Sequence, residues 1–90
     1  MSRAFVNEDA GSGAPGRRFV LPERDDPSYD AVAAETLLEA ARDGDTESAE
    51  RATGYYWGER KLHVHVRRIL ERAQASGDDR LETLARRFLR

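Results

Sequence analysis

The stretch DGDTESAE, residues 43–50, lies between two segments that both carry the apolar periodicity of an α-helix. Gly44 can adopt the left-handed conformation that ends a helix, and Asp45 or Thr46 can cap the helix that follows. Glu47 then lies in the first helical turn, where the helix dipole favours an acidic side chain. A polar turn this short predicts that the two helices pair as an antiparallel hairpin.

The helix before the turn is predicted to be short. Asp26 or Ser28 can cap it, and Pro27 suits its first turn. Small and apolar residues then recur at steps of three and four, as on one face of a helix: Tyr29, Val32, Ala33, Thr36, Leu37, Ala40 and Ala41.

The helix after the turn is predicted to be long and to run to about residue 75. Its apolar seam has a heptad-like spacing that only Glu59 interrupts, and consists of Ala52, Tyr55, Leu62, Val66, Ile69 and Ala73. Residues 54–66 allow an alternative, because Gly54 and Gly58 weaken a helix and LHVHV (62–66) alternates as a strand does. A β-hairpin of residues 55–57 with residues 62–66 is that alternative, and the helical composition on both sides favours the helix.

The two ends of the chain complete the predicted fold. Gly77 is a stop signal, and Asp78 or Asp79 can cap a short helix over residues 79–90. Before residue 28, AGSGAPG (10–16) and PERDDP (22–27) predict a flexible arm over residues 1–27, with apolar anchors at 5–6 and 19–21 that Tyr56 or Trp57 would meet. We therefore predict an all-α protein: a helical domain over residues 28–90, made of a short helix, a long helix and a short C-terminal helix, behind a flexible N-terminal arm.

Composition excludes several classes of protein. The chain has no cysteine, so disulfides and thiolate metal sites are excluded. No apolar run approaches the roughly 20 residues of a membrane span, which favours a cytoplasmic protein without a membrane contact. We find no nucleophile–base pair, phosphate loop or nucleotide motif, and His63 and His65 would point about 200° apart on a helix. We expect no enzyme, no metal held by this chain alone and no cofactor of its own.

Charge is distributed unevenly along the chain. Residues 1–50 hold 5 basic and 12 acidic side chains, a net charge of −7, whereas residues 51–90 hold 10 basic and 5 acidic ones, a net charge of +5. The basic half could meet an acidic partner or nucleic acid. Because the whole chain has a net charge of −2, we do not expect direct nucleic-acid binding; the weak candidates for it are Arg60, Lys61, Arg67 and Arg68.

Residues 40–73, AARDGDTESAERATGYYWGERKLHVHVRRILERA, resemble the helical hairpin of the bacterial Gre transcript-cleavage factors, whose tip reads close to GD-x-SENAEY. The opening SRAFVNED also resembles the start of some Gre-like proteins, and the two matches together cover about half of the chain. The matching residues of the hairpin are Ala41, Gly44, Asp45, Glu47, Ala49, Glu50, Glu59, Arg68, Ile69 and Glu71.

The resemblance implies a protein that binds RNA polymerase and modulates transcription elongation through an acidic tip. Asp45 and Glu47, flanked by Asp43 and Glu50, would complete the shell of a Mg²⁺ shared with the polymerase, which would position the attacking water. The other interpretation of Asp45 and Glu47 is that they are ordinary first-turn acids. The chain also departs from the family: its tip acids are two residues apart instead of three, its first helix is shorter, and the globular C-terminal domain is missing.

A second class of function stays open beside the resemblance to Gre factors. LLEAARDGDTESAERA (37–52) also resembles the opening helix pair of ankyrin-type repeats, but a single copy excludes a solenoid. A chain of 90 residues buries a thin core, so a partner or a second copy would stabilise it. The alternative function is therefore a small helical protein–protein interaction module, or a homo-oligomer, without a catalytic role.

Overall fold

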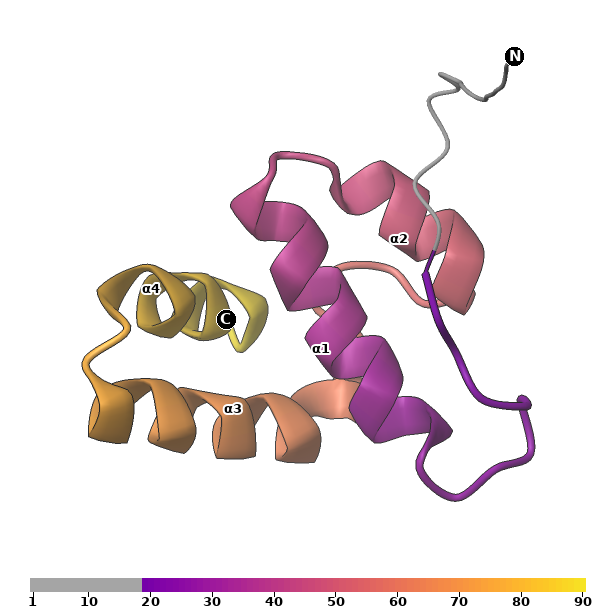
Figure 1. Cartoon of the computed structure of the whole chain (residues 1–90), viewed down its shortest axis with the longest axis horizontal. Coiled ribbons are helices and arrows are strands. Elements are labelled where there is room, and N and C mark those ends of the chain that lie inside the picture. The colour runs from indigo at the N-terminus through magenta and orange to yellow at the C-terminus, as the bar shows by residue number, and fades with distance from the viewer. Residues whose placement is uncertain (1–18) are drawn as a thin grey trace, which may run out of the picture.

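The computed structural model describes residues 19–90 of the chain. Within that range the protein is all-helical and has no strand, as predicted (Figure 1). Its elements are α1 (Tyr29–Arg42), α2 (Thr46–Thr53), the 3-10 helix η1 (Arg60–Leu62), α3 (His63–Ser76) and α4 (Asp79–Phe88). The first predicted anchor of the arm, Phe5 and Val6, and residues 1–18 as a whole lie outside the described residues.

Helix α1 is the central element, and α2, η1, α3 and α4 all pack on it (Figure 1). Its start depends on Asp26, whose carboxylate accepts hydrogen bonds from the backbone N–H of Ser28 at 2.8 Å and from the Ser28 hydroxyl at 2.7 Å. These two bonds hold the pKa of Asp26 below its usual value. Because α1 is surrounded, Ala33, Ala34 and Leu37 on it are completely buried.

The predicted turn between the first two helices is confirmed, but the predicted long second helix is wrong. Helix α2 ends at Thr53 after eight residues, and Gly54 follows it in the left-handed conformation, with φ of 80°. The chain then passes through a loop before η1 and α3. The β-hairpin alternative is wrong as well, because LHVHV (62–66) lies in η1 and α3.

The break has a physical cause beyond the weak helix propensity of Gly54. The Thr53 hydroxyl donates to the carbonyl of Ala49 at 2.8 Å and accepts from the backbone N–H of Tyr55 at 3.2 Å, so it turns the chain outward. The carboxylate of Glu50 accepts the backbone N–H of Trp57 at 2.8 Å, which holds the far side of the loop against α2. These bonds supply partners for backbone groups that the helix leaves unpaired.

The predicted C-terminal helix is confirmed as α4, and it closes the core. Asp78 caps it by accepting the backbone N–H of Leu81 at 3.1 Å. Phe88 near its end is completely buried, and its ring meets the rings of Trp57 at 4.9 Å and His63 at 6.0 Å between centroids. The loop, α3 and α4 therefore share one apolar centre with α1.

The second predicted anchor of the arm lies within the described residues. Phe19 and Leu21 are partly buried against the core, while Val20 between them is 94% exposed. Arg24 then places its guanidinium 5.2 Å from the ring centroid of Tyr29, within the range of a cation–π contact. The segment before α1 thus contacts the helices through alternate side chains.

Candidate functional site

The four acids of DGDTESAE have separate positions in the structure. Asp45 is the N-cap of α2, and its carboxylate accepts the backbone N–H of Ser48 at 3.4 Å. Asp43 is the residue that ends α1, where its backbone N–H donates to the carbonyl of Ala40 at 3.0 Å and the N–H of Gly44 donates to the carbonyl of Ala41 at 3.0 Å. Both acids therefore belong to the ends of helices.

The two remaining acids lie on α2 and differ in exposure. Glu50 is partly buried because its carboxylate binds the backbone N–H of Trp57. The side chain of Glu47 is 81% exposed and lies 3.5 Å from the guanidinium of Arg51, one turn further along α2. The carboxylate of Glu47 is thus more open to a partner than that of Glu50.

The described part of the chain holds no group of three or more His, Asp or Glu side chains placed to hold a metal ion. A role for Asp45 and Glu47 in a Mg²⁺ site shared with a polymerase accordingly stays a prediction. None of the helices within residues 19–90 is long and apolar enough to cross a membrane.

The four basic candidates, Arg60, Lys61, Arg67 and Arg68, are all exposed on η1 and α3. Lys61 and Arg68 have the spacing that places residues on one face of a helix, and His65 and Arg72 fall on the same face. We call this row the cationic stripe after Lys61, Arg68 and Arg72, with His65 between Lys61 and Arg68. Sequence inspection missed it as a unit, although its 4-3-4 spacing is the signal that could have found it.

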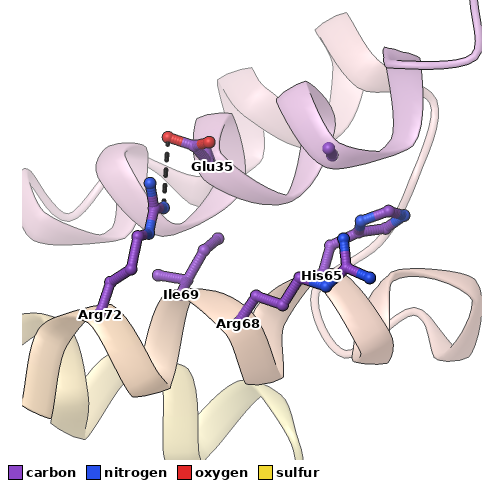
Figure 2. Close-up of a pocket in the computed structure, with 6 residues that line it drawn as sticks. Glu35, His65, Arg68, Ile69 and Arg72 are labelled. Atoms are coloured by element: carbon purple, nitrogen blue, oxygen red, sulfur yellow. Dashed lines mark ion pairs between the residues drawn. The ribbon is translucent and has the colours of Figure 1, made fainter.

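The stripe borders a crevice between α1 and α3 with a volume of about 210 Å³. Figure 2 shows the side chain of Glu35 reaching from α1 toward Arg72. Arg68 and His65 lie nearer to the start of α3. The crevice is lined by Ala31, Glu35, His65, Arg68, Ile69 and Arg72.

The electrostatics of the crevice are dominated by cations. Glu35 and Arg72 form an ion pair of 3.6 Å, and their side chains are 54% and 63% exposed. The side chains of Arg68 and His65 have no hydrogen-bond or ion-pair partner among residues 19–90. Ile69, only 4% exposed, supplies apolar surface. The arrangement can hold an anionic group beside an apolar one.

A second hollow of about 360 Å³ lies beside α2 and the loop, lined by Glu47, Glu50, Arg51, Gly54 and Tyr56. Tyr56 is 75% exposed there, whereas its neighbour Trp57 is packed on Phe88. The hollow is lined by two acidic side chains and one basic side chain. Both acids already have partners, since Glu47 pairs with Arg51 and Glu50 accepts the backbone N–H of Trp57. It is a weaker candidate than the crevice.

Comparison with known proteins gives no relative for this chain: no family model matches it, and no match was found among the curated proteins or the solved structures.

Proposed function

We propose that this protein is a small helical protein–protein interaction module that binds an acidic partner through the cationic stripe and has no catalytic role. The observation that carries the proposal is a row of three cationic side chains, Lys61, Arg68 and Arg72, beside an open crevice. Among residues 19–90, only Arg72 of the three has an anionic partner. Unpaired, exposed cations on a rigid helix attract an acidic surface and orient it as it approaches.

The remaining basic residues of η1 and α3 reinforce the proposal. Residues 60–72 contain five Arg or Lys side chains and one acid, Glu71. Helix α1 is acidic on the neighbouring side, with Glu35 and Glu39 spaced four residues apart on one helical row. Such a surface favours a partner whose carboxylates are confined to one face over a partner with uniform charge.

The proposal is tested by titrating the full chain, labelled with ¹⁵N, with acidic, neutral and basic helical peptides of equal length. We expect the acidic peptide alone to shift the amide resonances of α3, and its affinity to fall as salt is added. The matched variants are Lys61→Glu/Arg68→Glu, which reverses two charges of the stripe, and Arg87→Glu/Arg90→Glu, which makes the same change of net charge on α4 and just after it. Only the first should abolish binding, and equal binding of all three peptides would overturn the proposal.

Association with RNA polymerase is a second candidate, and the exposed carboxylate of Glu47 at the turn between α1 and α2 favours it. The short reach of α2 weighs against deep insertion into a channel, since eight residues extend about 12 Å. Binding of the purified polymerase of the same organism would test it, with Glu47→Gln as the variant that leaves the cap at Asp45 intact. If the polymerase binds and transcript cleavage changes in a manner that needs Glu47, the second candidate replaces the first.

A homo-oligomer is the other arrangement in which such an interaction module could act. A second copy could place the acidic row of its α1 against the stripe, and sedimentation at several concentrations and salt conditions would detect it. A constant monomer mass would leave an acidic partner of a different kind as the occupant of the stripe.

A further inference from the structure

The crevice between α1 and α3 is large enough for a side chain of a partner protein but small for a whole ligand molecule. Its volume of about 210 Å³ lies below the roughly 300–1,000 Å³ of pockets that enclose a small molecule. Ala31 and Ile69 provide apolar surface, and Glu35, Arg68 and Arg72 surround it with charges. It is therefore suited to receive one or two side chains that project from a partner.

The charges of the crevice select for carboxylates. A guanidinium binds a carboxylate through two parallel N–H···O bonds, and charge-assisted bonds of this kind measure about 2.7–2.9 Å. The pair of Glu35 and Arg72 is longer, at 3.6 Å, and both side chains are more than half exposed. Arg72 is thus held loosely by a carboxylate of its own chain, and Arg68 beside it has no carboxylate partner within residues 19–90.

Resting on the function proposed above, we propose that the crevice binds an acidic amphipathic helix of a partner protein, one carboxylate of which replaces Glu35 on Arg72 while a second binds Arg68. An aliphatic side chain of the same helix packs on Ile69. Arg68 and Arg72 are four residues apart, so carboxylates at a similar spacing on a partner helix can reach both. Glu35 then acts as a specificity residue, because the carboxylate of a ligand must compete with the Glu35 carboxylate for the guanidinium of Arg72.

Nucleic acid fits the crevice less well than an acidic helix does. A polyanion laid along the stripe would bring phosphates close to Glu35, which lines the crevice from α1, and like charges in such proximity repel. A peptide helix can place its few carboxylates on the arginines and present apolar side chains between them.

The test uses the full chain and a fluorescent helical peptide with two glutamates four residues apart and a leucine between them. We expect Arg68→Gln to weaken binding about fivefold, as for the loss of one exposed charge pair, and Arg67→Gln on the same helix to weaken it less than about twofold. Replacing the peptide's leucine by alanine should also weaken binding, and this measurement leaves the fold of the protein unchanged.

Glu35 gives the sharper part of the test. Glu35→Gln should strengthen peptide binding about threefold because it frees Arg72 from a competing carboxylate, whereas Glu39→Gln, one turn further along α1, should leave the affinity unchanged. If Glu35 served only to hold the fold, Glu35→Gln would weaken peptide binding instead. Equal effects of Arg67→Gln and Arg68→Gln, no gain with Glu35→Gln, or tighter binding of a single-stranded oligodeoxynucleotide would each overturn the inference.

The failure of this inference can be told from the failure of the proposed function. If the acidic peptide shifts the amide resonances of α3 and Lys61→Glu/Arg68→Glu abolishes binding, but neither Glu35→Gln nor loss of the peptide's leucine changes the affinity, the function of the stripe stands and the crevice is not the site. If no acidic peptide binds, both proposals fail together.

Discussion

At the scale of single residues, Tyr29 and Thr53 connect the start of α1 to the end of α2. The Tyr29 hydroxyl donates to the carbonyl of Thr53 at 2.8 Å, and both residues are almost completely buried. The carbonyl lies at the end of α2, where no helical N–H can reach it. One distant side chain thus satisfies a buried backbone group, and this helps the helix to end there.

We expect Tyr29→Phe to lower the free energy of unfolding by about 1–2 kcal/mol, since it leaves that buried carbonyl without a donor. Urea unfolding followed by far-ultraviolet circular dichroism measures the change. The matched control is Tyr56→Phe, because Tyr56 is 75% exposed and its substitution should have almost no effect. Equal losses for the two variants would mean that the hydrogen bond of Tyr29 contributes nothing.

Glu50 has a similar role in the loop after α2, although it was a candidate for the acidic tip. Glu50→Ala should lower the free energy of unfolding by about 1–2 kcal/mol, because the backbone N–H of Trp57 loses its acceptor. Glu47→Ala, which removes an exposed acid from the same helix, should change it by less than about 0.5 kcal/mol.

Fluorescence gives a second readout of this prediction, because Trp57 is the only tryptophan of the chain. We expect its emission to move to longer wavelength in Glu50→Ala and to stay in place in Glu47→Ala. An unchanged emission in Glu50→Ala would contradict a role of this carboxylate in holding the loop.

At the scale of elements, Asp78 connects the start of α4 to the end of α1. Its carboxylate accepts the backbone N–H of Leu81 at 3.1 Å and the guanidinium N–H of Arg42 at 3.0 Å. The bond from Leu81, followed by that from Arg42, holds the pKa of Asp78 below its usual value. A single side chain therefore caps one helix and pairs with another.

This pairing makes stability depend on pH in the acid range. Because the pKa of Asp78 is lower in the folded than in the unfolded state, its contribution is present above the ordinary carboxyl pKa of about 4 and is lost as the pH falls through the lower, folded value. Asp78→Asn retains a capping acceptor but cannot titrate. We expect the wild type to be more stable than this variant at pH 7 and the difference to shrink below about pH 4.

Urea unfolding from pH 7 down to pH 2.5 would measure this difference, with Asp25→Asn as the control for the loss of an exposed carboxylate. A difference between the wild type and Asp78→Asn that stays constant with pH would show that the charge of Asp78 does not stabilise the folded state.

At the scale of the whole molecule, Phe88 connects the last helix to the middle of the chain. Its ring is completely buried and meets Trp57 of the loop and His63 of α3. In a chain this short, loss of these contacts affects every element, because α1 packs on the same core.

Phe88→Ala should lower the free energy of unfolding by about 3–5 kcal/mol, a large share of the roughly 5–15 kcal/mol that holds a small domain folded. We expect the loss of helical circular dichroism to occur in one transition at lower temperature, because the core is shared. Val64→Ala at a position that is 48% exposed should change the stability by less than about 0.5 kcal/mol. Selective loss of α4 with α1 to α3 intact would show that the core is divided.

The sequence by itself determined the features that depend on a few neighbouring residues. The all-helical class, the turn at Gly44 and a cap of the last helix at Asp78 or Asp79 follow from periodicity and from capping groups within one turn of the helix end, and in the structure the cap is Asp78. These signals depend only on neighbouring residues, so they can be read from the sequence without the fold.

Only the tertiary structure decided where the second helix ends and which charges meet. The helical seam through residues 52–73 is a good local pattern, but the helix ends at Thr53, where Gly54 and the bonds of Thr53 and Glu50 turn the chain. The Tyr29 hydroxyl, from a distant part of the chain, supplies a donor to the Thr53 carbonyl there. The candidate site has the same origin, because Glu35 and Arg72 become neighbours only when α3 packs on α1. Periodicity shows which face of a helix is apolar, but the packing of the helices determines which side chains that face brings together.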